Sequence, residues 1–322
     1  MSRRWPTPSR HCDRRVSQET APGRAGFLEP AVFIPFAIVT LIWGSTWLVI
    51  RDQLGTVPPS WSVCYRFLVA AAGMFALAAA RKTPIRIGGR GLLFAAILGT
   101  LQFCGNFNLV YRAEQYVTSG VVAVIFALLI VPNTLLGWIS FRHPVARGFL
   151  IGSAIAIVGL GLLFLHEYHD AAVDPGHVVL GLGLTLTALL CASVANVMQG
   201  TQIARQLPML SVLAWAMLIG ALVDGAFAWA TVGPPVIDPR PGYMAGTLYL
   251  ALAGSVVTFP LYFRLIQKIG PGRAAYSSVL IPIIAMLLST LFEGYRWSLL
   301  AAVGAVLALV GMVIAMRARS AA

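Results

Sequence analysis

The residues of this chain that could carry chemistry are polar side chains placed inside long apolar runs. Two indoles and two hydroxyls gather in the stretch Trp43–Trp47, which reads WGSTW. At membrane depth such groups are costly and usually face a bundle interior or a water-filled path. In a helix, Thr40, Trp43 and Trp47 share one face, with Gly44 and Thr46 beside them. A flat indole next to a glycine offers an apolar wall for a small substrate. Packing against neighbouring helices is the alternative.

Amide and hydroxyl side chains form two further polar stripes. Gln102 and Asn106 are four residues apart, and Ser193, Asn196 and Gln199 step by three, so each set shares a helical face. An amide in lipid loses its hydrogen bonds to water unless another polar group replaces them, which predicts that both stripes face inward. They contact either a substrate or another helix, because interhelical hydrogen bonds of about 0.6 to 2 kcal/mol are ordinary in membrane bundles.

Two ionisable residues lie within apolar runs. Arg66 stands about six residues into its run, roughly 8 Å at about 1.5 Å per residue, so its side chain can snorkel to the membrane surface. Asp224 lies at a similar depth in a later run. The two could form a pair, or Asp224 could couple transport to protons. A helix-packing role is the plainer alternative.

Three prolines within apolar runs, Pro132, Pro260 and Pro282, are predicted to interrupt helices. The carbonyls that they free must face protein or water. Helix breaks at matched positions in two halves of a carrier usually mark a binding site or a hinge, and a static kink is the alternative. Tyr262 and Tyr276 complete the candidates for a central cavity.

The elements that must position these residues follow from composition. Of 322 residues, 58% are hydrophobic and 11% are charged, and the mean hydropathy is +0.82, whereas soluble domains carry about 25% charged residues. A spanning helix needs about 20 mostly apolar residues. We therefore predict an all-α membrane protein with ten transmembrane helices, at residues 33–50, 61–80, 91–110, 117–140, 147–165, 177–199, 209–230, 243–263, 274–292 and 298–316.

An internal repeat relates the two halves. Tyr111–Gly120 matches Phe263–Gly272 at an offset of 152, with shared Arg, Gln and Gly positions, while Pro132 and Pro282 differ by 150. Each half then holds five spans, and an odd number makes the second half enter the membrane from the opposite side. The prediction is two inverted five-helix repeats that enclose a site near the middle of the membrane.

Charge sets the expected orientation. Lys and Arg number 18 in one alternating set of loops and tails and 4 in the other, so the positive-inside rule places both termini in the cytoplasm. Residues 1–30 are expected to form a disordered basic tail. The repeats follow at residues 31–166 and 177–316, and a short tail occupies residues 317–322.

Other function classes lack support in the sequence. The net charge of +12 comes from residues between apolar runs, so nucleic acid is not an expected partner. The acids and histidines of His166–His177 lack a fixed ligand spacing, which favours a solvated outer loop over a metal site. The four cysteines lie far apart, as buried small residues would. No nucleotide loop or catalytic motif occurs, so neither a cofactor nor enzyme activity is expected.

A set of motif residues runs through both halves, namely Trp43–Thr46, Pro58-Pro59, Arg66-Phe67, Asn108, Tyr111, Ala113, Tyr116–Gly120, Pro282 and Phe292–Tyr295. Together they resemble the EamA branch of the drug/metabolite transporter superfamily, over residues 31–316. The resemblance implies a ten-helix inner-membrane carrier, commonly an exporter of amino acids, related metabolites or toxic compounds. The sequence departs from the family pattern after the fourth span, where Phe141-Arg142-His143 replaces an acidic residue, and after the ninth, where Glu293 stands in an altered setting.

The expected function is a secondary carrier that exports small metabolites by alternating access, with a small-molecule substrate and the lipid bilayer as partners. A membrane channel or a non-transporting scaffold is the alternative. No cluster of charges demands an anion or a cation, so a neutral, zwitterionic or weakly amphipathic solute fits best. Gly152 with Ala156 and Gly304 with Ala308 favour close helix contact, either within the bundle or between two copies in a homodimer.

Overall fold

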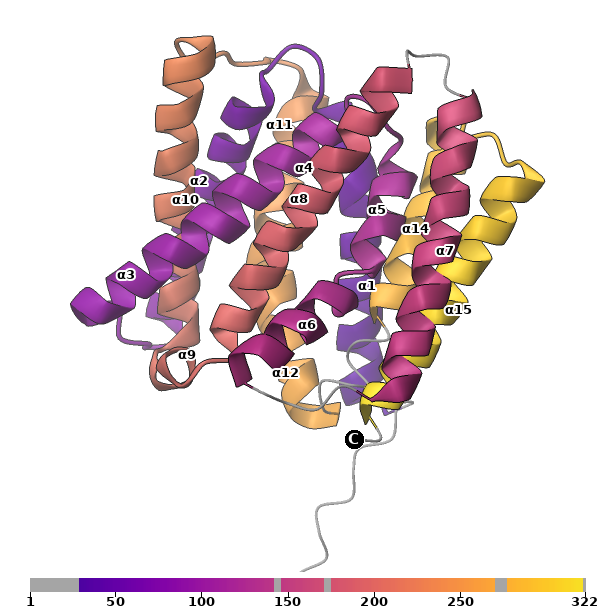
Figure 1. Cartoon of the computed structure of the whole chain (residues 1–322). Coiled ribbons are helices and arrows are strands. Elements are labelled where there is room, and N and C mark those ends of the chain that lie inside the picture. The colour runs from indigo at the N-terminus through magenta and orange to yellow at the C-terminus, as the bar shows by residue number, and fades with distance from the viewer. Residues whose placement is uncertain (1–28, 142–145, 171–174, 270–276, 321–322) are drawn as a thin grey trace, which may run out of the picture.

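The computed structural model describes residues 29–141, 146–170, 175–269 and 277–320, and every regular element within them is helical (Figure 1). The helices of the first half are α1 (Pro30–Asp52), α2 (Pro59–Ala80), α3 (Gly88–Leu98), α4 (Phe107–Ala113), α5 (Ser119–Ala127), α6 (Ile130–Phe141) and α7 (Arg147–Asp170). Those of the second half are α8 (Pro175–Gln199), α9 (Gln202–Gln206), α10 (Met209–Val232), α11 (Pro241–Leu248), α12 (Thr258–Ile269), α14 (Ser277–Phe292) and α15 (Leu299–Ser320).

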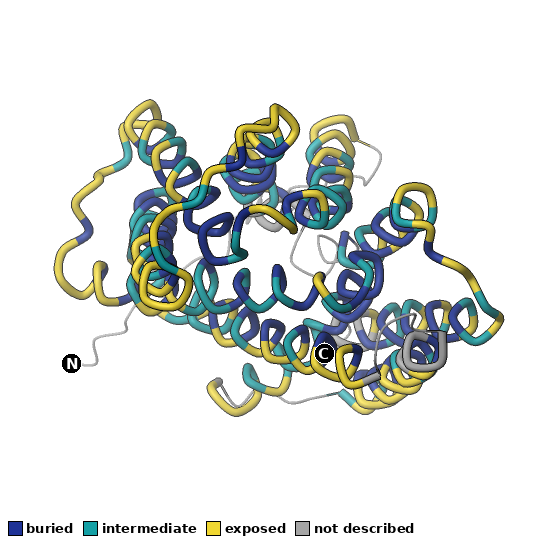
Figure 2. Tube along the Cα trace, turned by 90° about the horizontal axis from the view of Figure 1, so that it is seen from above, coloured by how far each residue is buried: buried dark blue, intermediate teal, exposed yellow. Residues whose placement is uncertain are grey.

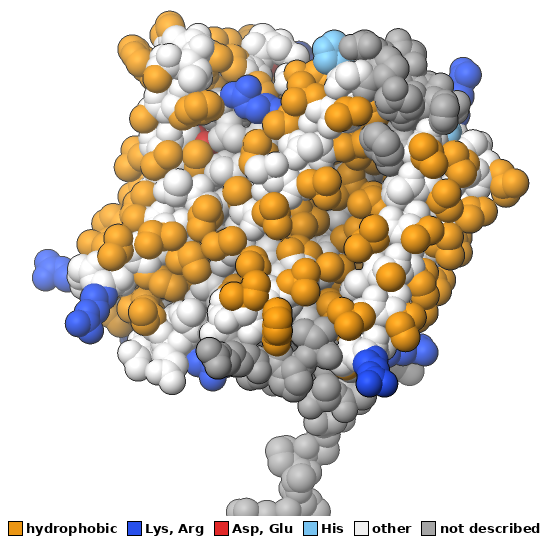
Figure 3. Space-filling view, viewed as in Figure 1, with side chains coloured by type: hydrophobic (Ala, Val, Ile, Leu, Met, Phe, Trp, Pro, Cys, Tyr) orange, Lys and Arg blue, Asp and Glu red, His pale blue; other side chains and the backbone are white. Residues whose placement is uncertain are grey.

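Each of the ten predicted apolar runs falls on helical structure. Within the described residues, seven helices are long and apolar enough to cross a membrane. The other three runs correspond to the shorter apolar helices Arg147–Leu163, Ser277–Phe292 and Leu299–Ala315. Large apolar side chains are exposed over the outside of the bundle (Figure 3), far beyond what a soluble monomer exposes to water. The chain is therefore a multi-pass membrane protein.

Two of the long helices contain a π-helical segment near their middle. The segment η1 (Gly99–Asn106) joins α3 to α4, and η2 (Tyr249–Val257) joins α11 to α12. π-Helical turns, with i→i+5 hydrogen bonds, are rare and are frequently found at functional sites. The two segments begin at residues 99 and 249, which are 150 residues apart, in agreement with the spacing of the sequence repeat. No pattern in the sequence predicts these two segments.

The three prolines differ in their effect on the helices. The fourth apolar run is interrupted at Leu128 and Leu129, between α5 and α6, and Pro132 follows in the first turn of α6. Pro260 lies in the first turn of α12, directly after η2. Pro282 lies within α14, which is continuous. The helix therefore does not end at Pro282, although this proline removes one hydrogen bond from its ladder. A hinge at Pro282 stays a prediction.

Helices at equivalent places in the two halves pack on each other. α2 lies against α10, and α7 lies against α15 on the opposite side of the bundle (Figure 1). Glycines bring the backbones of α7 and α15 together, because a Cβ atom at Gly152 would lie 2.6 Å from the Gly311 carbonyl oxygen. A Cβ atom at Gly159 would likewise lie 2.6 Å from the Gly304 carbonyl oxygen. The small residues of these helices thus make their close contact within the chain.

The middle of the bundle is formed by the first helix of each half. α1 contacts η2, α12 and α14, while α8 contacts η1, α4 and α6. Each π segment therefore lies beside the first helix of the opposite half. Seen along the bundle, the sides of the helices that face the interior are mostly buried, and the exposed residues lie on the rim (Figure 2).

The two ends of the bundle differ in charge. The end at which α9 lies also holds the start of α3, the start of α7 and the end of α15 (Figure 1). These termini carry Arg90, Arg147, Arg205 and Arg317, among other basic residues. We refer to this end as the basic end, and to the other as the distal end.

The segment predicted as an outer loop at residues 166–177 begins inside a helix. α7 extends to Asp170, and His166 is buried, with Nδ1 lying 2.9 Å from Ser298 Oγ and Nε2 lying 3.1 Å from the Arg296 carbonyl oxygen. The predicted loop is therefore wrong for His166. Residues 171–174, at the centre of that segment, lie outside the described residues.

Candidate functional site

The WGSTW stretch of α1 lies against η2. The indole Nε1 of Trp43 donates to the backbone oxygen of Gly254 at 3.2 Å, and Ser45 Oγ lies 2.7 Å from the Tyr249 hydroxyl. A Cβ atom at Gly254 would meet Thr46 Cγ2 at 3.2 Å, which is tighter than most van der Waals contacts. The glycine therefore lets the backbone of η2 approach the polar residues of α1.

The remaining residues of this stretch contact other helices. The Trp47 ring lies 5.2 Å from the ring of Phe126 in α5. A Cβ atom at Gly44 would lie 2.7 Å from Ile284 Cγ2 in α14, so this position requires glycine for the observed packing. Thr40 Oγ1 and Trp47 Nε1 are buried and have no hydrogen-bond partner among the described residues. The residues of the predicted face thus do not line one common surface, because Trp43 contacts η2 and Trp47 contacts α5.

Aromatic rings connect α1 with η1 and α2. The Trp43 ring lies 5.7 Å from Phe259 and 5.1 Å from Tyr262. Phe259 in turn lies 6.2 Å from Phe103 of η1, which lies 4.9 Å from Phe67 of α2. These centroid distances are typical of aromatic contacts. An aromatic cluster in the bundle interior therefore joins η1 to α1 and to α12, which directly follows η2. Tyr276, the other predicted tyrosine, lies outside the described residues.

Arg66 lies beside this aromatic cluster. It is 3% exposed, and its guanidinium carbon lies 4.4 Å from the centre of the Phe107 ring and 5.1 Å from that of Phe67. Both distances fit cation–π contacts. Nη2 would lie 3.7 Å from a Cβ atom at Gly254, so the side chain points toward η2. The predicted snorkelling of Arg66 is therefore wrong, because the side chain runs into the bundle.

Asp224 of α10 belongs to a separate buried polar group. It is fully buried, and its Oδ1 accepts a hydrogen bond from Asn108 Nδ2 of α4. Asn108 Oδ1 accepts from Ser60 Oγ at 2.7 Å, and Ser60 Oγ accepts from Arg112 Nη2 at 3.1 Å. The considered pairing of Asp224 with Arg66 is wrong, since Asp224 is bound by the amide. The sequence analysis set Asn108 aside because it lies off the face of Gln102 and Asn106.

The predicted polar stripes leave several atoms without partners. Gln102 Oε1 and Asn106 Oδ1, both in η1, are buried and have no hydrogen-bond partner within the described part of the chain. The same holds for Ser193 Oγ in α8, which packs against η1. Buried polar atoms without protein partners call for bound water or a ligand. These stripes are therefore suited to contact a polar solute.

Asn196 differs from its neighbours in the stripe. At about 100° per residue it lies on the same side of α8 as Leu189 and Ala192, which are buried, yet Asn196 itself is exposed. Gln199, one turn further on, is half-buried. Both lie in the last turns of α8, next to α9. The inward side of α8 is thus accessible near the basic end.

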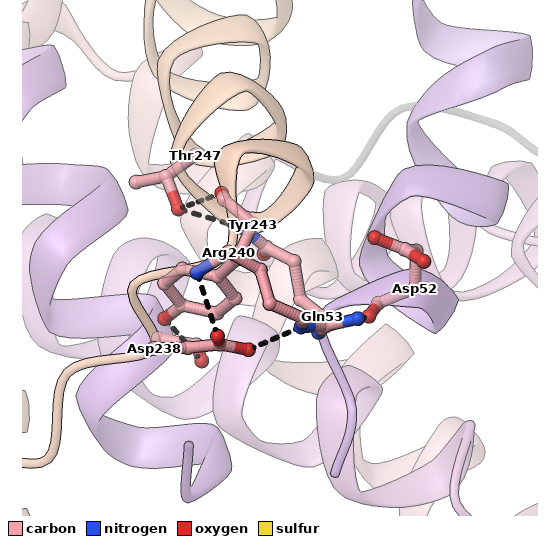
Figure 4. Close-up of polar contacts among 7 residues, drawn as sticks. Asp52, Gln53, Asp238, Arg240, Tyr243 and Thr247 are labelled. Carbon is pink, nitrogen blue, oxygen red and sulfur yellow. Dashed lines mark hydrogen bonds and ion pairs between the residues drawn. The ribbon is translucent and has the colours of Figure 1, made fainter. Parts of the chain in front are cut away.

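The distal end is held by a network of hydrogen bonds between the two halves (Figure 4). Gln53, which directly follows α1, accepts from the Tyr111 hydroxyl at 2.9 Å and donates to Thr247 Oγ1 of α11 at 2.7 Å. The Tyr243 hydroxyl, also from α11, lies 2.9 Å from Ser62 Oγ of α2. We call these five residues the distal network. It joins α1, α2 and α4 to α11, and so links the halves at this end.

A charged turn lies beside the distal network. Asp238 is buried and accepts from the backbone N–H of Arg240 at 3.0 Å and from its Nε at 2.7 Å, while Arg240 Nη2 donates to the Asp52 carbonyl oxygen at 3.4 Å (Figure 4). The hydrogen bond from the Arg240 backbone N–H is the largest cause that holds the pKa of Asp238 below its ordinary value. The hydrogen bond and the positive charge of the Arg240 guanidinium lower this pKa further.

The lowered pKa of Asp238 predicts a stability that depends on pH. Because the folded pKa is depressed, the contact stabilises the protein at neutral pH, and this contribution is lost as the pH falls through the folded pKa. We expect Asp238→Ala to lower the temperature of thermal unfolding at pH 7. The difference from the wild type should shrink towards zero in acid. A difference of equal size at both pH values would contradict this role.

Glu293 connects the end of α14 to the start of α5. Its carboxylate accepts from the backbone N–H of Ser119 at 3.1 Å, from the Ser119 hydroxyl, and from Ser289 Oγ at 2.9 Å. A carboxylate at the first turn of a helix is favourable because it meets unpaired N–H groups and the positive end of the helix dipole. In the described structure Glu293 thus positions α5 against α14. The other departure from the family pattern, at Phe141-Arg142-His143, cannot be placed beside it, because residues 142–145 lie outside the described residues.

The architecture and site can be compared with known proteins. The model of the EamA-like transporter family matches residues 32–165 and, a second time, residues 179–317. The chain belongs to this family. The match confirms the resemblance inferred from the motifs, and the EamA domain is present twice. Members of this family are transporters rather than enzymes.

Relatives of this EamA-like transporter include proteins named for efflux. Over 272 residues it is 29% identical to Protein PagO of Salmonella typhimurium, which covers 83% of this chain and 87% of that protein. Over 290 residues it is 23% identical to a probable amino-acid metabolite efflux pump of Escherichia coli, covering 86% of this chain and 92% of that protein. A solved crystal structure with 19% identity superimposes with a TM-score of 0.65, covering 90% of this chain and 98% of the other. This last likeness shows the fold alone.

Proposed function

We propose that this chain is a secondary transporter that exports small metabolites, such as amino acids or related compounds, by alternating access. The observation that carries the proposal is the contact between the WGSTW stretch and η2. There the first helix of one half meets an irregular helix of the other half, in the bundle interior. Carriers commonly bind their solutes at such irregular helices between repeats.

The proposal includes ten spans in two inverted repeats, at residues 31–166 and 177–316. The three shorter apolar helices add to the seven long ones to give this count. The contacts of α2 with α10 and of α7 with α15 support it, because equivalent helices of two-fold related repeats meet in this way. By the positive-inside rule the basic end is cytoplasmic, which puts both chain termini on the cytoplasmic side of the inner membrane.

A state open towards the cytoplasm is favoured by two features. Asn196 is exposed on the inward side of α8 near the basic end, and the distal network joins the halves at the other end. An exporter loads its solute from the cytoplasm in such a state. The residues proposed to contact that solute are Thr40, Trp43, Thr46, Trp47, Gln102, Asn106, Ser193, Asn196, Gln199 and Tyr262.

Flux through proteoliposomes tests the proposal. Vesicles containing the purified protein would be loaded with a mixture of amino acids and aromatic acids, and their loss followed by mass spectrometry against protein-free vesicles. A carrier gives saturable loss that is accelerated by the same solute on the opposite side. Flux that neither saturates nor responds to a solute on the opposite side would point to a channel. A scaffold would give no flux at all.

Asp224 is proposed to couple transport to protons, because its carboxylate is buried and Oδ2 has no hydrogen-bond partner among the described residues. Asp224→Asn keeps the shape and an acceptor for Asn108 but removes the ionisable group. We expect this variant to lose most of the flux driven by an imposed proton gradient, while exchange of solute without a gradient continues. Gradient-driven flux equal to that of the wild type would eliminate Asp224 as the coupling group.

A further inference from the structure

We propose that Arg66 binds the carboxylate of the transported solute, which is then a small organic acid or zwitterion with an apolar body. The inference rests on the proposed function and narrows its class of substrate. It also narrows the expectation of a neutral, zwitterionic or weakly amphipathic solute, which rested on finding no cluster of charges for the cavity.

The guanidinium of Arg66 is buried without a counter-ion. Nε and Nη1 are both inaccessible to solvent and have no hydrogen-bond partner among the described residues. No Asp or Glu carboxylate in the described part of the chain forms an ion pair with Arg66. An arginine stays protonated in proteins, and burying a charge without a counter-ion is strongly unfavourable. The Tyr111 hydroxyl is a hydrogen-bonding neighbour of this guanidinium, but Nε and Nη1 are still left without an acceptor among the described residues. These two nitrogens therefore need an acceptor such as water or an anionic solute.

The three buried acids of the described residues do not fill this role. Asp238 is bound by Arg240. Asp224 is bound by Asn108 of α4. Glu114 follows the end of α4, is fully buried, and interacts with Arg66 only electrostatically, beyond ion-pair distance. Both carboxylate oxygens of Glu114 also lack hydrogen-bond partners among the described residues. A charge-balancing role of Arg66 towards Glu114 is therefore the explanation that an experiment must separate from solute binding.

The position of Arg66 fits a solute site. The guanidinium lies between the Phe107 ring and the place where a side chain is missing at Gly254. Gly254 is the residue whose carbonyl accepts from Trp43, so the cation is close to the proposed site on α1. Arginine recognises carboxylates through charge-assisted hydrogen bonds. The surrounding rings of Phe67, Phe103 and Phe259 would cover an apolar solute body.

Matched acids and amides test this assignment. Proteoliposomes would be loaded with phenylacetate and phenylacetamide, and with N-acetylphenylalanine and its amide, each at equal concentration. After subtraction of leakage from protein-free vesicles, we expect the wild type to move each acid at least about tenfold faster than its amide, since a charge-assisted hydrogen bond is worth about 1.5 kcal/mol or more. Arg66→Met should abolish this preference, and Arg66→Lys should retain part of it.

Two controls separate the explanations. Arg90→Met removes an exposed positive charge at the basic end and should leave the preference unchanged. If Arg66 only balances Glu114, then Glu114→Gln should abolish the preference as well, which would overturn the proposal. Equal rates of acids and amides in the wild type would also overturn it, even if Arg66→Met did not fold. No flux of any solute would instead contradict the proposed carrier function.

Discussion

Gly159→Ala should strongly destabilise this protein, although it adds a single methyl group. The new Cβ atom would lie 2.6 Å from the Gly304 carbonyl oxygen and even closer to the backbone nitrogen of Ala308. Backbone atoms of a packed helix cannot turn aside as a flexible side chain can, so α7 and α15 would have to separate. Overpacking of this kind costs about 1–3 kcal/mol. The measurement is the temperature of thermal unfolding in detergent, together with the yield of monodisperse protein.

Gly161→Ala provides the matched control on the same helix. No atom lies within 4 Å of a Cβ atom at Gly161, so this substitution meets no steric obstacle. Alanine is favoured over glycine in a helix by about 1 kcal/mol, and the variant should be as stable as the wild type or more so. Equal unfolding temperatures for the two variants would show that α7 and α15 are not in backbone contact.

The second large effect is expected at Asn108. Asn108→Val removes the amide donor to Asp224 Oδ1 and leaves this fully buried carboxylate with the weak donor Cys104 as its remaining side-chain partner among the described residues. It also removes the acceptor of Ser60. An unsatisfied buried group costs about 1–3 kcal/mol, and more when it is charged. The variant should therefore unfold at a clearly lower temperature than the wild type.

A double-mutant cycle isolates the contribution of the charge. In the Asp224→Asn background, the group left behind by Asn108→Val is a neutral amide rather than a carboxylate. The same substitution should then cost less, and the difference between the two costs gives the coupling energy of the pair. Identical costs in both backgrounds would mean that the residues act independently. Unfolding would be followed by the same thermal assay, so that all four proteins are compared directly.

Much of the fold could be predicted from apolar run length, because a bilayer requires about 20 apolar residues in each helix. The described residues of the ten runs lie mostly in helices, and the repeat in the sequence corresponds to the two EamA matches. The π segments could not be predicted in this way, because α-helix and π-helix have the same apolar composition. A weak signal exists in hindsight: Gly105-Asn106 and Gly254-Ser255 place a glycine before a small polar residue in each segment.

The candidate site was predicted less completely than the fold. The polar residues of α1 were found, because two indoles and two hydroxyls stand out against apolar sequence. Their partners Tyr249 and Gly254 were not predicted, since neither residue type stands out in an apolar run of the other half. Arg66 was misplaced because distance along the chain gives depth in the membrane but not the direction of a side chain. Pairing of Asp224 likewise depends on a contact between helices that no local pattern encodes.

The two π segments have a mechanical consequence. The turns of each π segment are wider than those of an α-helix, because their hydrogen bonds run from i to i+5. The wider turn can move along the chain by one residue while the other backbone hydrogen bonds of the helix stay formed. At about 3.6 residues per turn, moving the wider turn along the helix rotates the residues that it passes by about 100° and shifts them by about 1.5 Å. In η2, such a rotation would carry Gly254 away from Trp43 and Arg66. A register change of one residue would therefore exchange the surface that the bundle interior presents, with both helix ends still anchored in place.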